Sequence, residues 1–263
     1  MDMTKDINND IKFFAKSEIR LKILSELNKQ PNNIRGIVKK TKITYSSVSS
    51  NIGKLEKRNY ITKSNKKYHV NPMTEVFFKS LMDFKQSVDL INDYEAFWNR
   101  HDLKQLSIES VKNITYLKDS EIIETTPTDI FKTHNTIKEQ IMQSENVKAI
   151  FPYLHPEYPK LIEEVLNNQG SVELIIPKSI SKELLSRMDL KTRQIAKRNG
   201  RLNVYEFKND LNIYLTICDG NISLGLFKSD GSFDQNRILI SDNQKSNLWA
   251  RELFAHVKEQ VMK

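Results

Sequence analysis

Residues 17–70 constrain the fold more than any other part of the chain, because three helical patterns and a basic hairpin pattern follow one another there. The first pattern, SEIRLKILSELNK, repeats apolar residues at helical spacing. Its apolar face consists of Ile19, Ile23, Leu24 and Leu27. IRGIVKK follows as a second short helix, and the turn TKI leads to a third, TYSSVSSNIGKLEKR. NYITKSNKKYHV then predicts two short strands around a polar turn.

The third helical pattern, residues 44–58, has a polar face that suits contact with DNA. Val48, Ile52 and Leu55 recur at spacings of four and three, so one stripe faces a core. Thr44 is expected as the N-cap, with its hydroxyl accepting from a backbone N–H of the first turn. The opposite face consists of Tyr45, Ser46, Ser49, Ser50, Asn51 and Lys54. Such short side chains allow a helix to enter the major groove, where Asn pairs with adenine, Ser with either partner, and Lys with phosphate or guanine.

The predicted hairpin, residues 62–68, adds positive charge beside this helix. Lys63, Lys66 and Lys67 lie on or next to its turn, where they would reach phosphates or the minor groove. Contacts of this kind set position and affinity but carry no sequence information. Three helices and a basic hairpin together predict a winged helix-turn-helix domain that holds DNA.

A second interpretation of residues 44–58 is an amphipathic helix with a solvated, serine-rich face. Serine is a mediocre helix former and gains nothing on an exposed helix, so four serines around one valine favour DNA contact. Two positions depart from the usual pattern of such domains. Lys42 and Asn59 stand where glycine is common: Lys42 is modestly strained if its φ is positive, whereas Asn59 tolerates the left-handed conformation. Gly53 lies inside the third helix, where it either allows close backbone approach or is simply tolerated.

Positive charge is concentrated at the start of the chain. Residues 1–70 contain 16 Lys and Arg against 6 Asp and Glu, a net charge of +10. The whole chain has a net charge of +8, so residues 71–263 carry −2. Concentrated positive charge steers a domain toward a polyanion and makes its binding depend on salt.

The composition indicates a cytoplasmic protein without membrane contact. The one cysteine, Cys218, lies in the apolar run IYLTIC, and we interpret it as a buried small side chain rather than a redox sensor. A single cysteine excludes a disulfide within the chain, as is usual in a reducing compartment. The first residues, MDMTKDINND, are polar and lack the apolar region of a signal peptide, and no apolar run is long enough for a membrane span.

The chain is long enough for two domains joined by a helix. We predict a DNA-binding domain over 1–71, a helical connector over 72–100 and a regulatory domain over 101–263. In the regulatory domain, β-branched runs alternate with helical stretches, which predicts an α/β domain with a mostly covered sheet. Strands are predicted at 147–151, 172–176, 202–207, 213–217, 222–227 and 237–240. Helices are predicted at 159–169, at 179–199 and from 241 or 242 to about 262. Gly170 and Gly200 are expected to end the first two of these helices.

The connector is predicted as one helix from Met73 to about Asn99, beginning near Pro72. Apolar residues recur along it at helical spacing. Two roles for this face stay open, since it either pairs with its twin in a dimer or packs on its own C-terminal domain. Trp98 and His101 at its end are interpreted as a buried joint between the helix and the domain.

Catalytic patterns are weak in this sequence. The five histidines are scattered, and no HExxH motif or Cys/His cluster indicates a metal site. Phosphate-binding glycine loops, a GxSxG elbow and the HxKxxxxD signature of phospholipase D are also absent from the sequence. We therefore expect no enzyme, no cofactor and no metal.

One loop is a candidate effector site. Tyr153, His155 and Tyr158 follow the end of a predicted strand, which is the usual mouth of an α/β sheet. Tyrosine and histidine there would suit a polar metabolite. The alternative is a surface loop stiffened by Pro152 and its neighbouring prolines.

Several stretches of the chain match a known family. They are SEIRLKIL and TYSSVSSNIGKLEKRNYI in the first quarter, AFWNRHDL (96–103), LKDSEIIETTPTDIF (117–131), NIYLTICDGNISLGLFKSDGSFD (212–234) and LWARELFAHVKEQ (248–260). In these stretches the chain resembles the archaeal winged-helix regulators that carry a methanogenesis-regulatory (FilR-type) C-terminal domain. The resemblance implies a homodimeric transcriptional regulator. It also implies a regulatory domain similar in fold to phospholipase-D-like and sugar-sensing domains, without their catalytic residues and with no defined ligand.

The sequence therefore predicts a mixed α+β and α/β chain, with a winged helix-turn-helix joined by a long helix to a non-catalytic, phospholipase-D-like α/β domain. The predicted function is sequence-specific DNA binding by a dimeric transcription regulator, whose C-terminal domain senses an unknown small-molecule or protein effector or mediates dimerisation. The alternative is a nucleic-acid-binding protein without sequence preference, either architectural or RNA-binding. A large ratio of specific to random binding separates the two.

Overall fold

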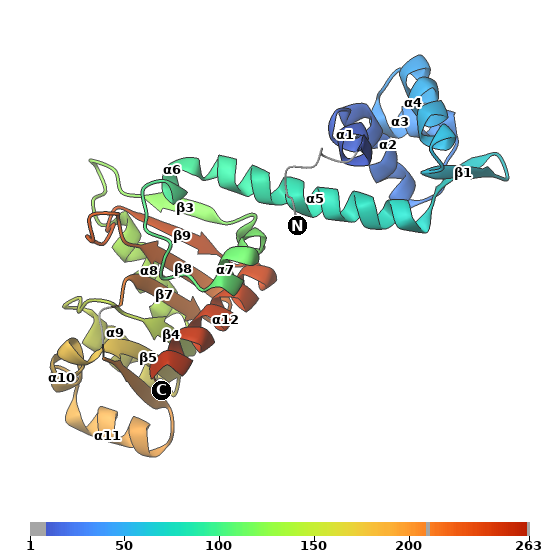
Figure 1. Ribbon diagram of the computed structural model, residues 1–263. Helices are drawn as coiled ribbons and strands as arrows, with labels where there is room; N and C mark the ends of the chain where they lie inside the picture. The colour runs from blue at the N-terminus through green and yellow to red at the C-terminus, as the bar shows by residue number, and fades with distance from the viewer. Residues whose placement is uncertain (1–8, 209–210, 262–263) are drawn as a thin grey trace. The chain divides into compact units, whose positions relative to one another are not determined.

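The computed structural model describes residues 9–208 and 211–261. The chain forms two compact units, Met1–Val88 and Asp89–Lys263, because most residue contacts lie within one unit or the other (Figure 1). The boundary between the units falls inside the predicted connector 72–100. The predicted domain limits themselves stay a proposal.

The first unit contains the three helices and the hairpin that the sequence predicts. Its elements in chain order are α1 (Asn9–Ala15), α2 (Glu18–Lys29), α3 (Ile34–Thr41), α4 (Tyr45–Lys57), β1 (Ile61–Ser64) and β2 (Lys67–Val70), followed by the start of α5 (Pro72–Asp93). The core between them is built from buried residues at helical spacing: Ile23, Leu24, Leu27, Ile37, Val48, Ile52 and Leu55. Tyr68 of β2 pairs with Asn32 before α3, so the hairpin is fixed to the helices.

Helix α1 is an element that the sequence patterns did not indicate. Phe14 is buried against Tyr60, with ring centroids 4.6 Å apart. The guanidinium groups of Arg20 and Arg58 lie 3.9 and 4.2 Å from the ring centroid of Phe13. Two adjacent aromatic residues, rather than a long apolar stripe, therefore attach this short helix.

The connector helix is shorter than predicted. Helix α5 begins at Pro72, as expected from the tolerance of proline in the first turn, but it ends at Asp93. Tyr94 leaves the helical conformation, and α6 (Glu95–Trp98) follows it. The Tyr94 hydroxyl donates to the carbonyl of Ser120, so a tertiary hydrogen bond accompanies the break.

The second unit is built on a seven-stranded mixed sheet with the order β3-β9-β8-β7-β4-β5-β6. Its strands are β3 (Glu121–Glu124), β4 (Asn146–Ile150), β5 (Ser171–Pro177), β6 (Leu202–Phe207), β7 (Ile213–Cys218), β8 (Asn221–Leu226) and β9 (Arg237–Ser241). Strands β4, β5 and β6 are parallel neighbours, and the other pairs are antiparallel. The six predicted strands are confirmed, whereas β3, with the charged ends of EIIE, escaped prediction.

Helices cover both faces of this sheet and give three layers (Figure 1). These helices are α7 (Ile108–Lys112), the 3-10 turn η1 (Ile114–Leu117), α8 (Lys132–Met142), α9 (Tyr158–Asn167), α10 (Lys178–Ser186), α11 (Leu190–Arg198) and α12 (Gln244–Val261). Leu174 and Ile176 of β5 face the α8–α11 side, and Ile175 faces the α12 side. Continuous burial along β5 follows from a sheet that is covered on both faces.

Two helix ends differ from the predictions. The helix predicted over 179–199 is two helices, and Asp189 caps the second by accepting from the Thr192 backbone N–H at 2.7 Å. Gly200 has a φ of 69° after α11, as expected, but after α9 the positive φ of 67° belongs to Gln169. Position 170 requires glycine for a steric reason, because a Cβ there would lie 2.4 Å from the carbonyl oxygen of Glu145.

The Cys218 thiol is buried, and burial raises its pKa to about 12. The burial confirms the interpretation of Cys218 as a small buried side chain. With its pKa raised the thiol is neutral, and a neutral thiol is a poor nucleophile. Among the residues that the structure describes, no helix combines the length and the apolar composition needed to cross a membrane.

Candidate nucleic-acid interface and C-terminal pocket

The outward face of α4 carries most of the predicted DNA-contacting residues. Tyr45 is 56% exposed, and Ser46, Ser50 and Lys54 are also exposed. Ser49 lies on the same face and is half-buried. The opposite stripe, with Val48, Ile52 and Leu55, is fully buried. The helix is therefore held by one face and presents short polar side chains on the other.

Two side chains of this helix are placed differently from the prediction. Thr44 occupies the N-cap position, but its side chain makes no capping bond and instead donates to the Ser47 hydroxyl at 2.9 Å. The prediction of a Thr44 capping bond is therefore wrong, because the Thr44 hydroxyl is directed at the Ser47 side chain and accepts from no backbone N–H of the first turn. The amide of Asn51 donates to the Ser47 carbonyl at 2.9 Å and is half-buried, so it must leave this bond to pair with a base.

Gly53 extends the exposed face of α4, and a Cβ there would have nothing within 4 Å. Gly53→Ala is expected to raise the free energy of unfolding of the first unit by about 1 kcal/mol, because glycine is a poor helix former. Urea denaturation measures this change. Gly36→Ala in α3 is the comparison: its Cβ would lie 1.9 Å from Asn32 Oδ1, so the Asn32 side chain must leave its bond with the Asn33 backbone N–H, and this variant is expected to gain less stability than Gly53→Ala. A loss of stability in Gly53→Ala would contradict the expectation.

The β1–β2 hairpin presents the three predicted lysines. Lys63, Lys66 and Lys67 are exposed, and Ser64 pairs with Lys67 across the turn. Asn65 and Lys66 both have positive φ, of 48° and 62°, as a two-residue hairpin turn requires. Lys42 and Asn59 also have positive φ, of 61° and 58°, in the two places where glycine was missing from the pattern.

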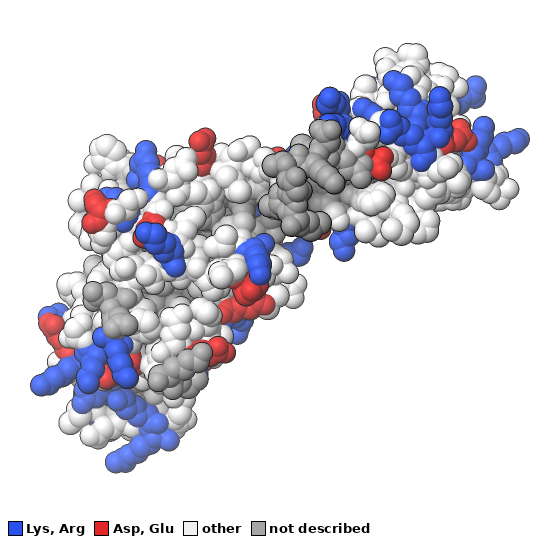
Figure 2. All heavy atoms as spheres, in the orientation of Figure 1, with Lys and Arg blue, Asp and Glu red and all other residues white. Residues whose placement is uncertain are grey.

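Lys and Arg gather over α3, α4 and the hairpin in Figure 2, in agreement with the charge imbalance of the sequence. The exposed basic residues there include Lys39, Lys40, Lys42, Lys54, Lys57, Arg58, Lys63, Lys66 and Lys67. A second basic group lies over α10 and α11. The sequence did not indicate this second basic group, because acidic residues elsewhere in 71–263 bring the net charge of that range to −2.

The C-terminal unit has a cavity of about 400 Å³ beside the carboxyl end of β4. The loop that follows β4 contributes Tyr153 and His155, and α8 contributes His134. Phe233 approaches from the β8–β9 connection. Two of the three predicted effector residues, Tyr153 and His155, therefore line one cavity.

Tyr158 does not line that cavity, because it is fully buried as the first residue of α9. Its hydroxyl donates to the Tyr153 hydroxyl at 3.3 Å. The Tyr214 ring is also fully buried, and its hydroxyl makes no hydrogen bond of good geometry. Burial raises the pKa of Tyr158 and Tyr214 well above the usual range, so both side chains are neutral in the core beneath Tyr153.

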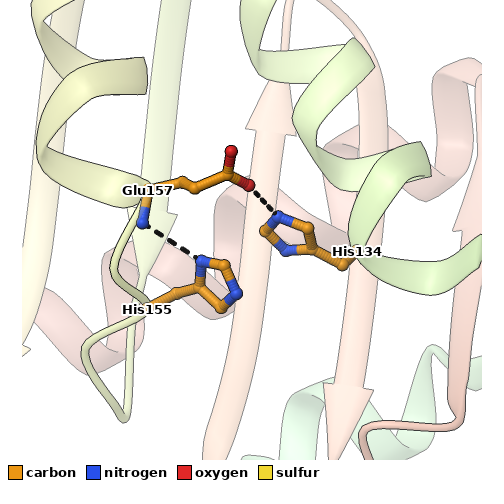
Figure 3. A group of neighbouring side chains, drawn as sticks. All are labelled: His134, His155 and Glu157. Carbon is orange, nitrogen blue, oxygen red and sulfur yellow. Dashed lines mark hydrogen bonds and ion pairs between the residues drawn. The ribbon is translucent and has the colours of Figure 1, made fainter. Parts of the chain in front are cut away.

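His134 and His155, which line the cavity, lie beside Glu157 (Figure 3). His134 Nε2 lies 2.6 Å from Glu157 Oε2, and the imidazole rings of His134 and His155 stack with centroids 3.9 Å apart. Lys138 donates to the other oxygen of Glu157 at 2.9 Å. Hydrogen bonds from Lys138 and then His134 lower the pKa of Glu157 to about 2. Burial is the main cause that lowers the pKa of His155, and the charge of the nearby His134 is the second. The neutral form of His155 is therefore favoured.

The sequence did not indicate His134, Lys138 or Glu157. His134 and Lys138 lie on one face of α8, and the turn before α9 supplies Glu157. No spacing rule connects these elements, since only the packing of α8 on α9 brings them together. The prediction that no metal site exists was drawn from scattered histidines, and two of those histidines are neighbours in space.

The end of the connector forms a buried joint, as expected. Trp98 Nε1 donates to the Leu90 carbonyl at 3.4 Å. His101 is buried, with Nδ1 2.6 Å from the Phe97 carbonyl and Nε2 3.2 Å from Asp234 Oδ2. Since His101 and Asp234 bond each other inside the protein, this pair ties the joint to the β8–β9 connection.

Two family models match most of the chain. The model of the methanogenesis regulatory protein FilR1, N-terminal domain, matches residues 8–83, and that of the FilR1 middle domain matches residues 130–260. The methanogenesis regulatory protein FilR1 of Methanothrix harundinacea (strain 6Ac) is 24% identical over 268 residues. The alignment covers 96% of this chain and 57% of that protein, so the chain spans a little over half the length of this curated relative.

Similarity to solved structures is weaker. TrmBL2, an archaeal chromatin protein, shows 11% identity and a TM-score of 0.42, with 95% of this chain and 96% of that chain covered. An O-methyltransferase family protein from Burkholderia thailandensis shows 7% identity and a TM-score of 0.24, with 77% and 65% covered. At such scores neither structure supports an argument about fold or function.

Proposed function

The chain belongs to the FilR1 family of regulatory proteins, and from this premise we propose that it is a sequence-specific, DNA-binding transcription regulator of the cytoplasm. In this proposal α4 enters the major groove and the β1–β2 hairpin contacts the phosphate backbone. The chain acts by binding rather than by catalysis. A role in the control of methanogenesis is part of the proposal, because the relative is a methanogenesis regulatory protein.

One observation carries the proposal: an exposed, serine-rich helix face stands next to a lysine-bearing hairpin on one small unit. Ser46 and Ser50 are exposed on α4, and Lys66 and Lys67 are exposed on the hairpin. The serines suit base edges, and the lysines suit phosphates. An exposed helix selected only for stability would carry better helix formers than serine.

The second candidate is a nucleic-acid-binding protein without sequence preference, either architectural or RNA-binding. The group of Lys and Arg over α10 and α11 favours it, because a second basic surface would contact any backbone.

Competition binding distinguishes the two functions. A duplex is first selected from a random-sequence pool, and its affinity is then compared with that of a scrambled duplex by competition at about 150 mM salt. The ratio of the two affinities is expected to be about 10³ or more. Equal binding of both, or stronger binding of RNA, would support the second candidate.

The regulator is proposed to be a homodimer that uses α5. Met73, Val76 and Phe84 are exposed on this helix, with Phe84 66% exposed. A cavity of about 620 Å³ between α1 and α5 is lined by Ile11, Phe14, Phe77, Leu81 and Phe84, together with Asp10 and Ser80. An exposed apolar stripe beside an apolar cavity is typical of an interaction surface. Since the first unit carries α4, pairing through α5 would set the distance between two recognition helices.

Phe77→Glu combined with Phe84→Glu is expected to convert the dimer to a monomer, because two charges would be buried in an apolar interface. Light scattering of the full chain measures the mass, which should fall from twice 30.7 kDa to 30.7 kDa. Ile108→Glu with Val111→Glu is the matched control, as both residues are exposed apolar residues of α7. A wild-type mass of one chain, or the same mass in every variant, would overturn dimerisation through α5.

The C-terminal unit is proposed to be the regulatory domain, with the phospholipase-D-like fold that the family resemblance implies. Tyr153 and His155 are proposed to contact an effector in the cavity beside β4. An effector shifts DNA affinity only by the difference in its own affinity for the two states of the protein.

A further inference from the structure

His134, His155 and Glu157 form the one group of three neighbouring metal-ligand side chains in the part of the chain that the structure describes. One ligand atom from each lies within 4.8 Å of the others. The residues come from α8 and from the turn between β4 and α9, so packed elements hold them (Figure 3). The Glu157 carboxylate bonds His134 through one oxygen and Lys138 through the other, and the Glu157 backbone N–H donates to His155.

We propose that His134, His155 and Glu157 bind a divalent transition metal ion of the zinc class. Two imidazoles and one carboxylate are a donor set that such ions take, whereas magnesium and calcium prefer oxygen ligands alone. The proposal goes beyond DNA binding and holds whether or not the first unit binds DNA. It rests on the proposed function only in making this ion a candidate effector of the regulatory domain.

The Glu157 carboxylate is held on one side by a hydrogen-bond donor, as the ligands of metal ions usually are. Lys138 donates to Oε1 of Glu157, which leaves Oε2 for the ion. In the structure Oε2 is 2.6 Å from His134 Nε2, and the ion replaces the proton that these two atoms share. Partners on the far side of a ligand orient it and hold it in place. The positive charge of Lys138 lowers the affinity, so the site is expected to be weaker than a closed zinc site with four ligands.

His155 must exchange one weak contact for the ion. Its Nδ1 accepts a long hydrogen bond of 3.3 Å from the Glu157 backbone N–H. Ligation through either ring nitrogen ends that bond, which is a small loss beside a metal–nitrogen bond. Three protein ligands leave a further position open, as in metal sites that also take a small molecule. The cavity of about 400 Å³, with Tyr153 and Phe233 in its wall, begins at the same histidines.

Zinc titration of the full chain, without a polyhistidine tag and after removal of metals, tests the proposal. Calorimetry is expected to show one Zn²⁺ bound per chain. His155→Ala and Glu157→Gln are each expected to weaken binding by at least about tenfold. His256→Ala is the matched control, since this exposed histidine of α12 bonds Gln260 and is not part of the three-residue group. That control should bind as the wild type does.

Urea denaturation in metal-free buffer checks that each variant folds, and the visible spectrum of bound Co²⁺ gives a second reading of the same ligands. Loss of the Co²⁺ bands in a folded His155→Ala variant would support the site. Absence of zinc binding by the wild-type chain, or equal binding by wild type and both site variants, would overturn it. No DNA is present in this titration, so its failure leaves the proposed DNA binding untouched, and failure of DNA binding leaves the metal site untouched.

Discussion

Replacing Ser46 and Ser50 by glutamate is expected to lower DNA affinity by about 100-fold or more. Both residues are exposed on one face of α4, so two carboxylates would stand against the DNA if this helix lies in the groove. Like charges brought together at an interface cost several kcal/mol, which corresponds to a loss of this size. Fluorescence anisotropy of a labelled duplex at about 150 mM salt measures the change.

The fold is expected to survive this substitution. Glutamate is a better helix former than serine, and this gain offsets the mild repulsion between carboxylates four residues apart. Gln105→Glu with Gln244→Glu is the control, because it adds the same charge at exposed positions of the second unit. If the α4 variant and this control bind DNA equally well, α4 does not face the DNA.

Removing two charges from the hairpin with Lys66→Asn and Lys67→Gln is expected to weaken binding to every duplex by about 30-fold at 150 mM salt. Each phosphate contact contributes about 0.9 to the slope of log affinity against log salt, so two contacts reduce the slope by about 1.8. Asparagine tolerates the positive φ of 62° at position 66, and the turn is therefore kept. A salt series of binding isotherms gives both quantities.

Lys112→Gln with Lys118→Gln is the control for the hairpin variant, since it removes two exposed lysines from the second unit. It is expected to leave the salt slope of the wild type nearly unchanged. A hairpin variant that kept the wild-type slope would show that Lys66 and Lys67 do not contact phosphates. A variant that lost affinity for only some sequences would assign these lysines to base contacts instead.

The sequence predicted the local elements well where periodicity was strong. The buried stripes of α2 and α4 and the six strands of the C-terminal sheet follow from apolar spacing. Lys42 was expected to be modestly strained if left-handed and Asn59 to tolerate that conformation, and both have positive φ. Elements fixed mainly by tertiary contacts were missed: α1 depends on the Phe14–Tyr60 contact, and the break after α5 on the Tyr94–Ser120 hydrogen bond.

The candidate sites show the same division. Exposure on α4 followed from its helical period, but the hydrogen bond of Asn51 to Ser47 is a matter of rotamer choice that no pattern reveals. His155 was found because it follows a strand end. His134 and Glu157 could not be found this way, because 23 positions separate them and only helix packing brings them together.

Selection of duplexes from a random-sequence pool, by the full chain and by its Ser46→Ala, Ser50→Ala variant in parallel, tests the central claim most directly. The wild-type chain is expected to enrich one motif, and the variant to lose preference at a few adjacent base pairs while it keeps the remainder. A motif that appears twice, with centres about one DNA turn apart, would report the dimer as well. Failure of the wild-type chain to enrich any motif, or the same motif at every base pair for both proteins, would contradict sequence reading by α4.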